Sequence, residues 1–160
     1  MHLEAAQGWL GLGNHLEADA ELNNITPALK THPDVLEVRW LICARTKNWV
    51  ACVDVSNAII RIAPKRTIGW INRANSLYWS RHTQEAFDSL LPAVDRFPKV
   101  WVIPYDLACY CAQLGQIAEA KTWLAKAFAI PTSASEKQFV KLTALQDPDL
   151  EPIRKSTEQL

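Results

Sequence analysis

Cysteine, histidine and carboxylate side chains are the groups in this 160-residue chain that could bind a metal ion or catalyse a reaction. The four cysteines are Cys43, Cys52, Cys109 and Cys111, and no CxxC motif occurs. Cys109 and Cys111 are two residues apart, which on a helix directs their side chains about 200° away from each other. We therefore interpret the thiols as structural and reduced, with metal binding or redox chemistry as the alternative.

The remaining chemical groups do not form a catalytic pattern either. The chain has four histidines, which are scattered: His2, His15, His32 and His82. Asp147 and Asp149 are close in sequence, but they fall in a terminal segment where ending a helix is the simpler role. There is no HExxH or GxSxG motif and no glycine-rich phosphate loop, since the Gly-Leu-Gly of residues 11–13 fits a turn between helices. The sequence therefore predicts no enzymatic activity, no metal and no cofactor.

The composition excludes several other classes of protein. The 17 basic and 17 acidic residues balance, whereas nucleic-acid-binding proteins usually carry a basic excess. No apolar run approaches the roughly 18 residues of a membrane span. The first residues have neither the basic start nor the apolar stretch of a secretory signal. With 49% hydrophobic residues, the chain can bury a core, and we expect a cytoplasmic protein.

Apolar residues recur with helical spacing along most of the chain, interrupted by short polar turns. The pattern predicts an all-α fold in which consecutive helices form pairs. Pro92 is expected to kink its helix, and Ser133 with Glu136 forms a capping box that opens the last helix. The segment from Asp147 to Ile153 is expected to stop that helix. The predicted helices cover residues 2–11, 15–29, 34–46, 48–62, 67–80, 83–96, 101–113, 117–129 and 134–146.

Small residues recur along the chain at an interval of 34 residues. One series has small side chains throughout: Ala18, Cys52, Ala86 and Ala120. A second series has one exception, a tryptophan: Ala6, Trp40, Ala74 and Ala108. Such an interval is typical of a helical repeat, in which small side chains let neighbouring helices approach closely. Gly13 and Gly115 fit the turns within a pair, and Pro64 and Pro98 fit the ends of repeats.

These residues resemble the tetratricopeptide repeat (TPR). The third copy carries the family's pattern in Trp70, Ala74, Leu77, Ala86, Leu90, Ala93 and Pro98, and the fourth matches it again from Leu107 to Ala127. The resemblance implies an α-solenoid, a right-handed superhelix of four helix–turn–helix repeats with a C-terminal capping helix. We expect one domain over residues 1–160, with the capping helix at 134–146 and the repeats at 2–32, 33–66, 67–100 and 101–132.

In a stack of this kind the first helix of each pair lines a concave groove that binds protein segments. Aromatic and amide side chains there suit an extended peptide or a helix. The alternative is that Tyr78 and Trp79 only pack against adjacent helices. The register predicts these groove residues: Gln7, Leu41, Ile71, Asn72, Asn75, Tyr78, Trp79, Tyr105, Asp106 and Cys109.

Charge is distributed unevenly although the total is zero. Residues 1–37 hold six acids and one base, a net charge of −5, and residues 38–84 hold eight bases and one acid, a net charge of +7. The basic segment suggests an acidic partner, with a merely solvated surface as the alternative. The acidic N-terminal segment of one copy could also meet the basic segment of another. The arginines expected to contact an acidic partner are Arg39, Arg45, Arg66, Arg73 and Arg81.

Some members of the repeat family clamp a C-terminal carboxylate with groove lysines and asparagines. Asn75 matches one such asparagine, but the other clamp positions hold different residues, so that mode is not expected here. The chain also resembles bacterial proteins compared with kinesin light chains, which associate with tubulin-like filaments. We therefore predict an adaptor that binds an acidic protein segment, with a self-associating assembly module as the alternative.

Overall fold

The computed structural model describes residues 1–158, with side chains through residue 155. Every regular element in this range is a helix, which confirms the predicted all-α class. The chain forms two compact units, Met1–Ser80 and Arg81–Leu160. Among the helices of residues 1–158, none has both the length and the apolar character needed to cross a membrane.

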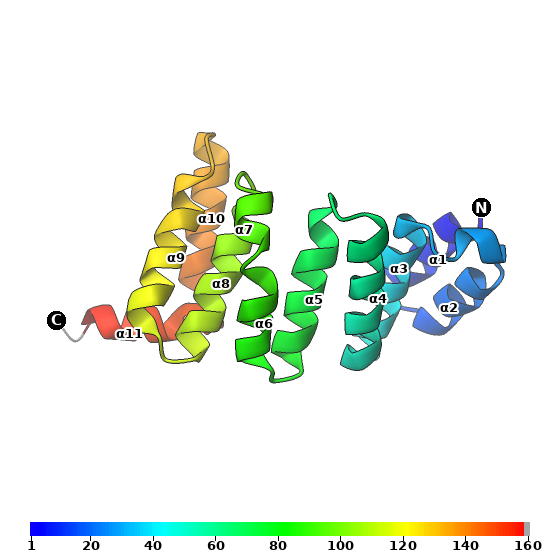
Figure 1. Ribbon diagram of the computed structural model, residues 1–160, viewed down its shortest axis with the longest axis horizontal. Helices are drawn as coiled ribbons and strands as arrows, with labels where there is room; N and C mark the ends of the chain where they lie inside the picture. The colour runs from blue at the N-terminus through cyan, green and yellow to red at the C-terminus, as the bar shows by residue number, and fades with distance from the viewer. Residues whose placement is uncertain (159–160) are drawn as a thin grey trace. The chain divides into compact units, whose positions relative to one another are not determined.

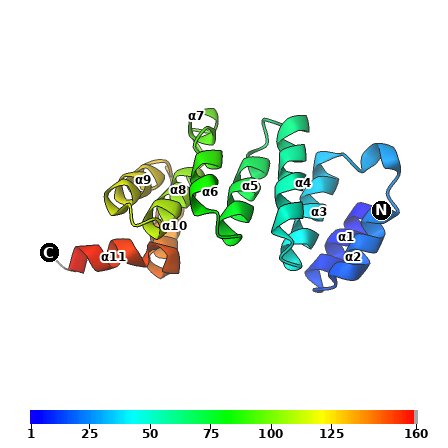
Figure 2. The same cartoon turned by 60° about the horizontal axis from the view of Figure 1, so that its bottom comes forward.

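The first unit consists of helices packed against their neighbours in the chain (Figure 1). Side chains set the helix starts, because Asn14 accepts a hydrogen bond from the backbone N–H of Glu17 and Asn48 accepts one from Ala51. α4 and α5 lie side by side in both ribbon views (Figures 1 and 2). The helices are α1 (His2–Gly11), α2 (His15–Asn23), α3 (Pro33–Arg45), α4 (Trp49–Ile62) and α5 (Thr67–Trp79).

The core of the first unit contains the small residues that recur every 34 positions. Ala6, Ala18, Cys52 and Ala74 have no exposed surface, as the repeat predicts. The closest approach is at Gly69 of α5, where an added Cβ would lie 2.9 Å from Cγ2 of Ile59 in α4. Only a residue without a side chain allows the two helices to pack at that distance.

The turn inside each helix pair repeats one backbone conformation. The residue after the first helix is left-handed at four positions spaced by 34: Gly13 (φ 80°), Lys47 (φ 54°), Arg81 (φ 71°) and Gly115 (φ 77°). In the second pair, the N–H of Asn48 donates to the carbonyl of Cys43 at 2.9 Å, which closes the end of α3. Glycine is expected at such a position, and Lys47 and Arg81 occupy it at a conformational cost of about 1 kcal/mol each.

The second unit has α8 packed on α9 and α11 packed against both. Ser133 caps α10 by accepting a hydrogen bond from the N–H of Glu136 at 3.2 Å, as the capping box predicts. The helices are α6 (Thr83–Leu90), α7 (Ala93–Arg96), α8 (Val102–Gln113), α9 (Ile117–Ala129), α10 (Ala134–Gln146) and α11 (Glu151–Glu158), with a 3₁₀ turn at Pro148–Leu150 before α11.

Prolines account for three differences from the predicted helices. α2 ends at Asn23 rather than residue 29, because Thr26 before Pro27 is extended and a separate 3₁₀ turn follows. The helix containing Pro92 is broken into α6 and α7 rather than kinked, since proline lacks an N–H. α10 ends at Gln146 as predicted, but a further helix that the sequence did not predict, α11, follows, and Pro152 lies in its first turn, where no backbone donor is needed.

Candidate functional site

The predicted groove residues of the first unit differ widely in exposure. Leu41 and Trp79 are each 46% exposed and Gln7 is exposed as well, whereas Ile71, Asn75 and Tyr78 are half-buried. Asn72 is only 6% exposed, so its side chain adds little to the exposed surface and its groove role stays a prediction. The exposed first-helix surface of this unit therefore consists of fewer side chains than the register predicts.

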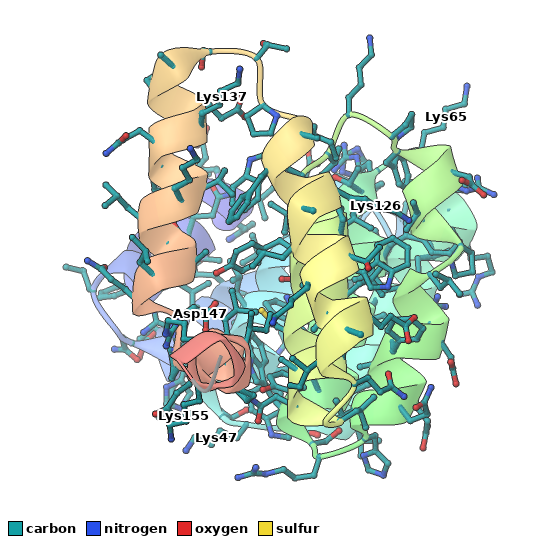
Figure 3. All side chains as sticks on the ribbon, turned by 90° about the vertical axis from the view of Figure 1, so that its left-hand side faces the viewer. Lys47, Lys65, Lys126, Lys137, Asp147 and Lys155 are labelled. Carbon is teal, nitrogen blue, oxygen red and sulfur yellow. The ribbon has the colours of Figure 1, made fainter. Side chains whose placement is uncertain are left out.

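The predicted groove residues of α8 are also largely covered. Tyr105 and Cys109 are each 5% exposed, and the Tyr105 hydroxyl donates a 2.7 Å hydrogen bond to Asp147, which lies beside α11 in Figure 3. Trp101 packs edge-on against both Tyr105 and Phe139 of α10. Burial raises the pKa of the Tyr105 hydroxyl and of the Cys109 thiol. Tyr105 and Cys109 are thus covered in part by Asp147, Asp106 is half-buried, and the groove role of all three stays a prediction.

Two of the predicted partner-binding arginines already have acidic partners within the first unit. Arg39 lies 3.3 Å from a carboxylate oxygen of Asp19, and Arg66 donates to Asp34 at 2.5 Å and to Glu37 at 2.8 Å. The hydrogen bond from Arg66 holds the pKa of Asp34 below its usual value. Part of the basic segment is thus compensated by the acidic N-terminal segment of the same copy, and a role of Arg39 and Arg66 in binding an outside acid stays a prediction.

The other three predicted arginines differ in burial and in their contacts. Arg73 is half-buried: it lies over the Trp70 ring at 5.2 Å and donates to Asn57 at 3.4 Å, and burial lowers its pKa. Arg81 is exposed at the start of the second unit. Arg45 is exposed at the end of α3 and forms no ion pair with the described residues. Arg45 is therefore the predicted arginine of the first unit that remains available to an outside acid.

Arg45 borders a pocket of about 520 Å³ in the first unit, which we call the indole pocket. Three tryptophans form much of its wall: the Trp79 ring lies 5.2 Å from that of Trp49 and 6.2 Å from that of Trp40. The remaining lining residues are the apolar Leu41 and Ala44 and the cationic Arg45 and Lys47.

Each wall of the indole pocket comes from a different helix. Trp40 and Leu41 lie on α3, Trp49 begins α4, and Trp79 ends α5. Trp40 is held in place by its indole N–H, which donates to the Ser76 hydroxyl at 3.1 Å. Since α4 packs against both α3 and α5, the three rings are positioned by helix packing. An apolar wall bordered by cations can bind an apolar group attached to an anionic one.

The sequence pattern indicates binding roles for Leu41, Arg45 and Trp79, but it does not mark Trp40, Trp49 and Lys47 as parts of the same site. Lys47 stands in the series Gly13, Lys47, Arg81, Gly115, and this 34-residue spacing was a usable signal. No comparable signal marks Trp49, because the corresponding residues of the other pairs are His15, Thr83 and Ile117.

No cysteine is among the residues that line this pocket. All four are free thiols, and Cys43 is half-buried whereas Cys52, Cys109 and Cys111 are buried. Burial raises the pKa of Cys52 and of Cys111 to about 11. Within residues 1–158, no group of three or more His, Cys, Asp or Glu side chains is placed to hold a metal ion.

Comparisons with known proteins bear on the fold. No protein-family model matches the chain, and no curated protein matches it. Among solved structures, a chain titled "MamA RS-1 ArsTM double mutant" matches with a TM-score of 0.70 and 12% sequence identity, covering 81% of this chain and 72% of that one. That neighbour is a TPR-containing protein, so the likeness shows a TPR-like, α-solenoid type of fold. At 12% identity it bears on the fold alone, and the resemblance to kinesin light chains stays a prediction.

Proposed function

We propose that this protein is a non-enzymatic adaptor that binds an acidic protein segment along the first helices of its helix pairs. One observation carries the proposal: the surface of α3 and α5 in the first unit combines exposed apolar groups with an unpaired cation. Leu41 and Trp79 are each 46% exposed, and Arg45 has no acidic partner among the described residues. Large exposed apolar side chains next to charges are typical of protein-binding surfaces.

The fold supports the same proposal. Helix pairs stacked in a TPR-like manner present their first helices along one surface, and such repeat surfaces commonly bind protein segments. Gln7, Ile71, Asn75 and Tyr78 belong to this proposed surface in the first unit, and Arg73 and Arg81 are proposed to add positive charge to it. In this proposal the partner is a protein, and the site lies in the cytoplasm, which suits four free thiols.

The acidic character of the partner is the finer part of the proposal. Residues 38–84 carry a net charge of +7, and the internal pairs of Arg39 and Arg66 neutralise only part of it. A tubulin-like filament is the specific partner we propose, because filaments commonly present acidic surfaces or tails and because of the resemblance to kinesin-light-chain-like repeat proteins.

Fluorescence anisotropy with labelled glutamate-rich and lysine-rich peptides of equal length tests the adaptor proposal. We expect binding of the glutamate-rich peptide only, weakening as salt rises from about 50 to about 300 mM. Equal binding of both peptides, or binding of neither, contradicts the proposal. Cosedimentation with polymerised tubulin tests the filament: the protein should pellet with polymer at low salt and remain in the supernatant at high salt.

A second candidate function is self-association, favoured by an apolar pocket in the first helix pair. This pocket has a volume of about 440 Å³ and is lined by Leu3, Ile25, Leu29 and Val35 among others. Leu29 is 55% exposed, so a second copy could cover it. Sedimentation velocity at several concentrations separates the candidates. A monomer at all concentrations favours the adaptor, whereas multimers that Leu29→Glu dissociates favour the assembly module.

A further inference from the structure

The indole pocket carries a cation at a backbone position that disfavours it. Lys47 has φ 54°, and the equivalent residues of the first and fourth pairs, Gly13 and Gly115, are glycines with similar left-handed backbones. A glycine would form the same turn without strain, so the fold itself does not need lysine there. Arg81 of the third pair is also a cation with a left-handed backbone (φ 71°), so what distinguishes Lys47 is its place in the pocket lining.

The charges around the indole pocket indicate what kind of ligand it suits. Arg45 and Lys47 are both exposed and both line the pocket, and no acidic residue lines it. Neither side chain forms an ion pair within residues 1–158, in contrast to Arg39 and Arg66 on the same unit. The two cations therefore leave an uncompensated positive charge at the border of an apolar pocket.

The wall of the pocket accepts a large apolar group. Trp79 is 46% exposed although its ring packs against two other indoles, and Leu41 beside it is also 46% exposed. A phenyl ring fits within the volume of about 520 Å³, and ring-on-ring contacts add about 0.5–1.5 kcal/mol to the free energy of burial. A cationic ligand is excluded, because Arg45 and Lys47 would repel it and no carboxylate is present to bind it.

We propose that the indole pocket binds one aromatic side chain of a protein segment in which carboxylates flank that side chain. The aromatic ring enters among Trp40, Trp49 and Trp79, and the flanking carboxylates pair with Arg45 and Lys47. This inference rests on the proposed adaptor function and deepens it, because it names the site and the partner's local chemistry.

The experiment uses a short fluorescein-labelled peptide with one central Phe between pairs of Glu residues. Two further peptides serve as comparisons, one with Phe replaced by Ser and one with every Glu replaced by Gln. We expect each replacement to weaken binding to the full chain by about tenfold. Trp79→Ala, which removes part of the wall, is expected to have the same effect as removing Phe from the peptide.

Lys47→Gly is the sharpest variant, because it removes the charge while relieving the backbone. We expect binding of the Phe-Glu peptide to weaken by about fivefold while the melting temperature stays equal or rises. The matched control is Lys65→Gly, which removes one exposed charge from the same unit but lies outside the pocket lining. We expect this control to bind the peptide as the wild type does.

The outcomes distinguish the pocket from the general adaptor function. If the Phe and Ser peptides bind equally well with the same salt dependence, acidic segments bind elsewhere and the indole pocket proposal is wrong, while the adaptor stands. The same conclusion follows if Lys47→Gly binds as the wild type does, or if Lys65→Gly weakens binding as much. If no glutamate-containing peptide binds a fully folded protein, both proposals fail.

Discussion

The indole Nε1 of Trp40 donates a 3.1 Å hydrogen bond to the hydroxyl oxygen of Ser76, and both side chains are buried. Trp40 stands in the repeat series that holds alanine in the other pairs, where so large a residue is unexpected. The Ser76 hydroxyl also donates to the carbonyl of Asn72 at 2.6 Å. α3 and α5 accommodate the indole because Ser76 is small and also supplies an acceptor for the indole N–H.

Ser76→Ala is expected to lower the free energy of unfolding by about 1–3 kcal/mol, because it leaves the buried indole N–H without an acceptor. Ser56→Ala is the matched control. The Ser56 hydroxyl is equally buried and donates a 2.7 Å hydrogen bond to the carbonyl of Cys52, but it accepts no hydrogen bond from an indole N–H. Urea denaturation measures both variants. A loss no larger for Ser76→Ala than for Ser56→Ala would show that the indole bond contributes nothing to stability.

Gly69→Ala is expected to destabilise the protein even though alanine favours helix by about 1 kcal/mol. The new Cβ would lie 2.9 Å from Cγ2 of Ile59, a fully buried side chain, so α4 and α5 must separate. Such overpacking costs about 1–3 kcal/mol. Gly8→Ala in α1 is the control, because no atom lies within 4 Å of its added Cβ, and it should stabilise. Thermal melting that rises for both variants would contradict the close approach.

The Asp34–Arg66 pair predicts a pH dependence of stability in acid. Because the hydrogen bond from Arg66 lowers the pKa of folded Asp34 below the ordinary value of 3.8, the unfolded chain binds the proton first as pH falls. This contribution to stability is therefore complete above that ordinary value and is lost as pH falls through the lower, folded value. In a plot of the free energy of unfolding against pH, Asp34→Asn should flatten this acid part of the curve. Asp54→Asn, which changes an exposed carboxylate on α4, should leave it unchanged.

The cysteines predict an order of thiol modification in the native protein. Cys43 is only half-buried, so a disulfide reagent at neutral pH should modify it before the other three, and Cys43→Ser should abolish that first phase.

Burial raises the pKa of Cys52 and Cys111 from 9.0 to about 11. The unfolded thiols thus ionise first, and stability should fall as pH rises from about 9 to about 11. Rapid modification of all four thiols in the folded protein would contradict the burial.

Local pattern was sufficient to predict most of the helices. The helices at 2–11, 117–129 and 134–146 have the predicted bounds, and the small residues that recur every 34 positions, such as Ala18 and Ala120, are fully buried. Both results depend on spacing along one or two neighbouring helices, which the sequence records directly. The errors in helix bounds lie near prolines. A proline in the sequence does not by itself show whether the helix kinks, breaks or begins again at that point.

The sequence by itself determined that this chain is a series of helix pairs and that small residues spaced by 34 are buried, because the periodicity of apolar and small residues is a local property. Only the tertiary structure decided which charges remain uncompensated. Arg66 meets Asp34 and Glu37 across about thirty residues of chain, whereas Arg45 and Lys47 meet no acid among the described residues. It also brought Trp40, Trp49 and Trp79 together, since side chains on three different helices converge only when those helices pack.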